Sequence, residues 1–107
     1  ATPHGTITTI PYTVEMNDIA VYALQQHQSD VFLKRGIDQF DRLYREGADN
    51  ARIMALSIHP YITGVPHRIR YLEELLDYII SHEGVELMTA SDIGDWYRSE
   101  MARHGSV

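Results

Sequence analysis

Apolar residues recur along the chain at two different spacings, and the spacing predicts which segments form strands. Residues 6–12 are β-branched and partly alternating, residues 52–58 form a nearly continuous apolar run, and residues 85–88 form a short third run. Such segments are typical of β-strands, and a continuous apolar run is typical of a strand covered on both faces. The sequence therefore predicts three strands, the middle one ending where His59 precedes Pro60.

Three other segments carry apolar positions three and four residues apart, which predicts helices. The first spans residues 30–46, the second spans residues 66–83, and the third follows an N-cap at Thr89 or Ser91. Residues 13–29 form a long connection. The alternation of strands and helices predicts an α/β fold with parallel strands and right-handed crossovers. The expected apolar faces of the helices are Leu33, Ile37, Phe40 and Tyr44, then Ile69, Leu72, Leu76 and Ile79, and finally Ile93, Trp96, Tyr97 and Met101.

Three parallel strands would leave two exposed edges and uncovered apolar faces. Three βα units are also too few for a closed α/β barrel, which takes roughly 250 residues. We therefore expect the remaining strands to come from an N-terminal segment of the same domain, from another chain or from a second copy in a homo-oligomer. The alternative is a compact three-stranded fold that stands alone.

Composition narrows the classes of partner. The 107 residues suffice for one domain, with 44% hydrophobic and 22% charged residues and a formal net charge of -6. No basic run is present, so neither nucleic acid nor a membrane surface is an expected partner. The chain has no cysteine, which excludes disulfides and thiolate chemistry and fits a reducing, cytoplasmic location.

His59 is the principal candidate for chemistry. It stands at the predicted C-terminal end of a buried strand, where α/β folds carry their catalytic groups. An imidazole exchanges protons near neutral pH, which suits a general acid or base. The alternative is a histidine that only hydrogen-bonds a loop carbonyl.

Further polar residues follow the first predicted strand. Glu15, Asn17 and Asp18 can orient a base, bind substrate hydroxyls or cap a helix, although an Asn-Asp pair after a strand is often only a turn. Tyr12 and Tyr61 stand at equivalent strand ends and can line a pocket, or can simply pack there with a solvated hydroxyl.

Arg68 lies where a loop enters a helix, and backbone N–H groups at such a point can bind an anion. An ordinary helix-start loop is the alternative. None of the six histidines pairs with another at metal-ligand spacing, so we expect no metal site built from this chain alone. The sequence also lacks a nucleophile-elbow motif and a Gly-rich phosphate loop.

Residues 53–68, which read Ile-Met-Ala-Leu-Ser-Ile-His-Pro-Tyr-Ile-Thr-Gly-Val-Pro-His-Arg, resemble the last conserved block of the polysaccharide deacetylase family. This is the NodB-homology, or carbohydrate esterase 4, family. Residues 10–18 resemble the preceding block, and residues 39–44 and 95–97 extend the resemblance to nearly the whole chain. The chain looks most similar to the branch that contains bacterial metal-independent allantoinases and a cytoplasmic-type peptidoglycan deacetylase.

The resemblance implies a distorted (β/α) barrel of about seven strands, of which this chain would supply the C-terminal three βα units. It also implies an amide hydrolase of carbohydrate metabolism that N-deacetylates a glycan, with His59 as the general acid. Zinc, its ligands and the catalytic base would lie outside this chain, so the isolated segment would bind no metal and be inactive. Glu15, Asn17 and Arg68 would shape the substrate pocket, and Tyr12, placed at a strand end, is the fourth candidate substrate-binding residue.

Two other functions stay open at this point. One is an allantoinase-like hydrolase that opens a small cyclic amide. The other is a non-catalytic module that assembles through its open strand edges.

Overall fold

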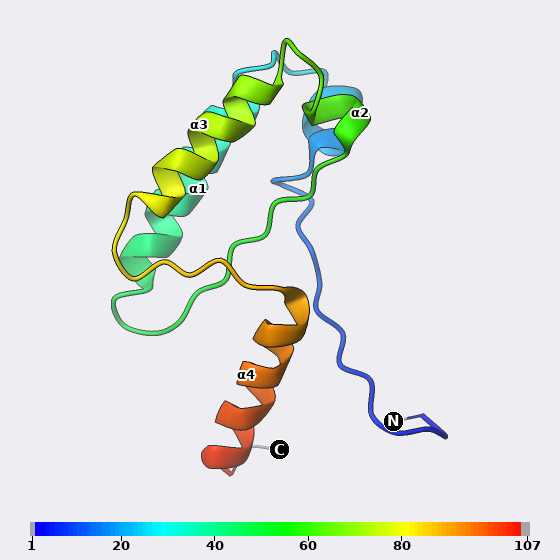
Figure 1. Ribbon diagram of the computed structural model, residues 1–107, viewed down its shortest axis with the longest axis vertical. Coiled ribbons are helices and arrows are strands. Elements are labelled where there is room, and N and C mark those ends of the chain that lie inside the picture. Colours follow the sequence, from blue (N-terminus) through cyan, green and yellow to red (C-terminus); the bar gives the residue numbers. More distant parts are fainter. Residues whose placement is uncertain (1, 106–107) are drawn as a thin grey trace. The chain divides into compact units, whose positions relative to one another are not determined.

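The computed structural model describes residues 2–105, and its regular elements are helices (Figure 1). In chain order they are a π-helix, η1 (Ile19–Leu24), and four α-helices: α1 (Val31–Glu46), α2 (Pro60–Thr63), α3 (Ile69–Ile80) and α4 (Ala90–Arg103). The chain divides into two compact units. One unit is Tyr12–Val85, and the other comprises residues 2–11 together with residues 86–105.

The expected strands are absent, so the prediction of an α/β fold made of three βα units of a barrel is wrong. Residues 6–12, 52–58 and 85–88 contain no strand, and the described residues hold only two isolated bridges, Asn17↔Ser57 (parallel) and Thr2↔Gly5 (antiparallel). β-propensity reflects packing against neighbouring strands, and these segments have no such neighbours in this structure. The strand edges that the assembly hypothesis requires are therefore also missing from residues 2–105.

Helices α1 and α3 pack against each other in the larger unit (Figure 1), and its buried core also includes Met16, Val21, Tyr22 and Ile62. Phe32, Gly36 and Phe40 make the buried stripe of α1, and Leu75 and Ile79 make that of α3. Gly36 permits the close approach, because a Cβ atom at this position would lie 2.5 Å from a methyl carbon of Leu75.

Contacts farther along the two helices show that they run parallel. The Phe40 and Tyr78 rings meet edge to face with 5.7 Å between centroids, and the Tyr78 hydroxyl donates to Asp41 at 2.5 Å. Nearer the C-terminal ends, the Tyr44 hydroxyl donates to the Glu83 carbonyl at 2.7 Å. Residues later in α1 therefore contact residues later in α3. These contacts fix the register of the two helices, which flank residues 51–59 in the sequence.

Helix α4 belongs to the smaller unit and has a regular start. The Thr89 hydroxyl accepts a hydrogen bond from the Asp92 N–H at 3.1 Å, as expected of one of the two proposed N-caps. Its expected apolar face is not well buried, because Trp96 is 45% and Tyr97 is 51% exposed.

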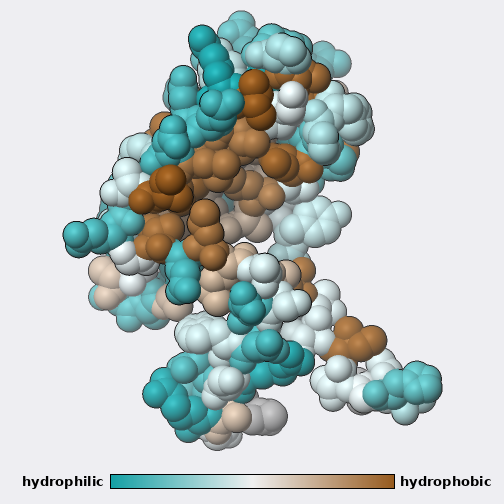
Figure 2. Space-filling view, viewed as in Figure 1, coloured by the Kyte–Doolittle hydropathy of each residue, from teal (hydrophilic) through white to brown (hydrophobic). Residues whose placement is uncertain are grey.

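Apolar side chains also reach the surface of the larger unit. Figure 2 shows them gathered over one face, and the exposed apolar residues of this unit include Ile53, Leu76 and Ile80. None of the described helices combines the length and the apolar character needed to cross a bilayer.

Candidate active site

A single parallel bridge brings the two sequence blocks of interest together. The Asp18 N–H donates to the Ser57 carbonyl at 3.0 Å, and the Ser57 N–H donates to the Met16 carbonyl at 2.9 Å. His59 follows two residues after Ser57 and lies beside Asp18, although His59 and Asp18 are 41 positions apart in the chain. The bridge thus sets the register on which the site depends.

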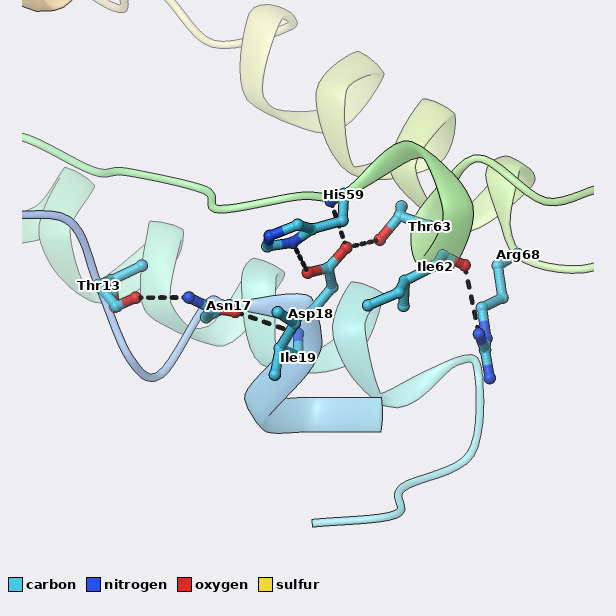
Figure 3. A network of polar contacts seen from close by, with 8 residues as sticks. All are labelled: Thr13, Asn17, Asp18, Ile19, His59, Ile62, Thr63 and Arg68. Carbon is cyan, nitrogen blue, oxygen red and sulfur yellow. Dashed lines mark hydrogen bonds and ion pairs between the residues drawn. The ribbon is translucent and has the colours of Figure 1, made fainter. Parts of the chain in front are cut away.

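The Asp18 carboxylate is the buried centre of the site (Figure 3). It accepts three hydrogen bonds: from the His59 N–H at 2.6 Å, from the Thr63 hydroxyl at 2.7 Å and from the His59 ring Nδ1 at 2.8 Å. Burial by itself would raise the pKa of Asp18, but these hydrogen bonds outweigh it and lower the pKa below the ordinary value. Asp18 is therefore a carboxylate, and it can only accept.

Local sequence explains why the donors converge on Asp18. His59 has an extended backbone (φ -121°, ψ 129°), which the following proline favours, and Pro60 opens the short helix α2 at a position suited to proline. The N–H of His59, the residue before α2, and the hydroxyl of Thr63, the last residue of this short helix, both donate to Asp18. Asp18, which precedes η1, is thus the shared acceptor of donors from both ends of α2.

The ionised Asp18 fixes the protonation pattern of the His59 ring. Because a carboxylate only accepts, Nδ1 of His59 carries a hydrogen and donates it to Asp18. The second ring nitrogen, Nε2, is then free to give or take a proton. The His59 side chain is 37% exposed, whereas Asp18 is fully buried, so a proton reaches solvent or a ligand through His59.

His59 opens onto a hollow of about 480 Å³. No Lys, Arg, Asp or Glu side chain lines it, so its wall is mainly apolar with a few neutral polar groups. The lining residues are Tyr12, Val14, Asn17, Ile19, Ala20, Leu24, Ser57, Ile58 and His59.

Tyr12 and Asn17, two of the four expected substrate-binding residues, lie at this hollow with His59. Tyr12 is 74% exposed and has its ring available. The Asn17 amide is engaged locally, since its oxygen accepts from the Ile19 N–H at 3.0 Å and its nitrogen lies 3.5 Å from the Thr13 carbonyl (Figure 3). Asn17 therefore shapes the wall more than it offers free hydrogen-bonding groups.

Glu15 and Arg68, the other two, do not line the hollow. The Thr13 hydroxyl donates to Glu15 at 2.6 Å and lowers the pKa of its carboxyl. The Arg68 guanidinium lies over the Tyr22 ring, 4.4 Å from its centroid, and donates to the Ile62 carbonyl at 3.2 Å (Figure 3). Both side chains make contacts that stabilise nearby parts of the chain, and their contact with a substrate stays a prediction.

Tyr61 follows His59 without lining the hollow. Its ring meets the His59 ring edge to face with 6.0 Å between centroids, and it is 73% exposed.

Zinc was expected to find its ligands outside this chain. Within residues 2–105 no three His, Asp or Glu side chains converge as a metal-binding group, and the Asp18 carboxylate is already taken by three donors. The described residues thus do not form a zinc site by themselves.

Comparison with known proteins identifies two similar sequences. A protein of Schizosaccharomyces pombe, named as a candidate polysaccharide deacetylase, is 40% identical over 87 residues, which cover 78% of this chain and 27% of the relative. The peptidoglycan deacetylase of Helicobacter pylori is 39% identical over 59 residues, which cover 55% of this chain and 20% of the relative. No family model and no solved structure matches the chain.

The chain therefore matches about a quarter of the length of one deacetylase-named relative and a fifth of the other. Both names agree with the resemblance drawn from residues 10–18 and 53–68, while the branch within the family stays a prediction. The sequence similarity supports a relationship to the polysaccharide deacetylases, at the level of the family and not of a branch.

Proposed function

We propose that this chain carries the proton-donating part of an amide hydrolase that removes N-acetyl groups from a glycan. The observation that carries the proposal is the hydrogen bond between the buried Asp18 carboxylate and Nδ1 of a part-exposed His59. The deacetylase names of two relatives support the choice of reaction.

Amide hydrolysis needs a proton for the departing nitrogen, because an amine anion is a very poor leaving group. A protonated His59 can deliver that proton from Nε2 while Nδ1 stays bonded to Asp18. Asp18 contributes by fixing the orientation of the ring, which leaves Nε2 as the nitrogen that is not bonded to Asp18. Asp18 is thus a positioning residue, and His59 is the group that meets the substrate.

The remaining parts of the reaction would come from polypeptide outside this chain. When bound, zinc in such an enzyme would polarise the amide carbonyl and activate water. Residues 2–105 contain no group of three His, Asp or Glu side chains that could hold the metal, and the resemblance places the base outside this chain, so we propose that the isolated segment is inactive.

The test is acetate release by the full-length protein from an N-acetylglucosamine oligomer, with allantoin as the second substrate. We expect His59→Gln to lower turnover of the oligomer by about 100-fold and Asp18→Asn to lower it by about 10-fold. His67→Gln is the matched control, because His67 is exposed and does not line the hollow. Full activity of the His59 variant would refute the proposal, and turnover of allantoin alone would assign the protein to cyclic amide hydrolysis.

A further inference from the structure

We infer that Ser57 is a substrate-binding residue whose hydroxyl recognises an uncharged polar group of the substrate. This group, a hydroxyl or an amide, lies beside the amide bond whose nitrogen His59 protonates. The inference rests on the proposed function, because it assigns a partner for the substrate at the same site.

The position of Ser57 is fixed by its backbone. Its N–H and carbonyl are both used in the bridge to Met16 and Asp18, at 2.9 and 3.0 Å. Ser57 and His59 lie two residues apart in a segment without helical structure, and both line the hollow. Ile58, which lies between them, lines the hollow as well, so three consecutive residues form one part of its wall.

The Ser57 hydroxyl is not needed for the structure itself. Within residues 2–105 it makes no hydrogen bond, whereas the polar atoms around it are engaged: Asn17 with Ile19, and Asp18 with His59 and Thr63. Ser57 is also only half-buried, so a ligand can reach it. A free hydroxyl on a fixed backbone, two residues from the proton donor, is suited to contact with a substrate.

The chemistry of the hollow indicates what Ser57 would bind. No Lys, Arg, Asp or Glu side chain lines the hollow, so a cationic group there would lose hydration without gaining an ion pair, and an anionic group could pair only with the proton that His59 must give to the leaving group. A neutral hydroxyl or amide can instead exchange one hydrogen bond with Ser57, which both donates and accepts. Carbon surface of the same substrate can rest on Leu24, which is 76% exposed, and on Tyr12.

The experiment compares Ser57→Ala, Ser57→Thr and Ser57→Val in the full-length protein, with the N-acetylglucosamine tetramer as substrate. We expect KM to rise about 5- to 10-fold for the Ala and Val variants, as the loss of one neutral hydrogen bond predicts, and to stay near its original value for Thr. Thr and Val have the same shape, so their difference reports the hydroxyl even if the Ala variant folds poorly. Ser99→Ala, at an exposed position of α4, is the matched control.

The outcomes separate the two proposals. Equal KM values for the Thr and Val variants, together with a large loss for His59→Gln, would overturn the role of Ser57 and leave the proposed function standing. Full turnover by His59→Gln, or no turnover of the tetramer by the unmodified protein, would overturn both.

Discussion

At the scale of single residues, one carboxylate determines how the candidate proton donor is held. Asp18 accepts from the backbone and the ring of His59 and from Thr63, so the two sequence blocks meet at one buried charge. Removing a buried charge that satisfies three donors leaves those donors without their acceptor, which makes Asp18 important for both stability and chemistry.

The first prediction concerns the hydrogen on the His59 ring. With Asp18 present, neutral His59 carries its hydrogen on Nδ1, and Asp18→Asn should shift the ring towards the Nε2–H form, because the carboxylate that requires an Nδ1 donor is gone. Nitrogen-15 chemical shifts of the ring distinguish the two forms. An Nδ1–H ring in the variant, or an Nε2–H ring in the unmodified protein, would contradict the arrangement, and His67 provides an exposed reference ring in the same spectra.

The sequence predicts part of this site. It places His59, Tyr12 and Asn17 as candidates, and all three line the hollow. It does not show whether Asp18 belongs to the site or only to a turn or a helix cap, because an Asn-Asp pair suits each of these roles equally well. Thr63 could have been the signal: its hydroxyl and the N–H of the residue before Pro60 are two donors four positions apart, and buried donors require an acceptor.

At the scale of elements, the three long α-helices were predictable, whereas the short helices η1 and α2 and the absence of strands from residues 2–105 were not. Helices α1, α3 and α4 appear where the spacing of apolar residues predicts them, because that spacing is local information. Their buried faces differ in detail: α1 buries Phe32 and Gly36, and α3 buries Leu75, while Leu76 is 37% exposed. Strands need partners distant in the sequence, and within residues 2–105 residues 52–58 find only the bridge at Ser57.

The second prediction tests the contact between α1 and α3. Gly36→Val places methyl groups where the fully buried Leu75 already lies, so we expect the free energy of unfolding to fall by about 2 kcal/mol. Urea unfolding of the chain measures the change. Lys34→Val, at an exposed position of α1, is the control and should alter stability by no more than roughly 0.5 kcal/mol. Equal stabilities of the two variants would show that the helices do not pack closely at Gly36.

At the scale of the whole molecule, the fold is sensitive to acid through a buried carboxyl group. The hydrogen bonds to Asp18 lower its pKa in the folded chain relative to the ordinary value of 3.8. The unfolded chain therefore takes up this proton first as the pH falls, so the stabilisation is complete above the ordinary pKa. It is lost as the pH falls through the depressed pKa of the folded state.

The third prediction follows from that linkage. The unmodified chain should be more stable than Asp18→Asn at pH 7 by about 3 kcal/mol, and the difference should shrink as the pH falls below about 3.8. Urea unfolding of both proteins at pH 7 and pH 3 measures it. A difference that is the same at both pH values would mean that Asp18 is not an ionised acceptor in the folded chain.

The proton-donor role of His59 is tested most directly by varying the leaving group. In the full-length protein we expect His59→Gln to slow cleavage of an N-acetyl amide by about 100-fold, because the departing amine needs its proton. The same variant should cleave p-nitrophenyl acetate at nearly the unmodified rate, because that phenolate leaves without protonation. An equal loss on both substrates, or no loss on the amide, would contradict the assignment of His59 as the general acid held by Asp18.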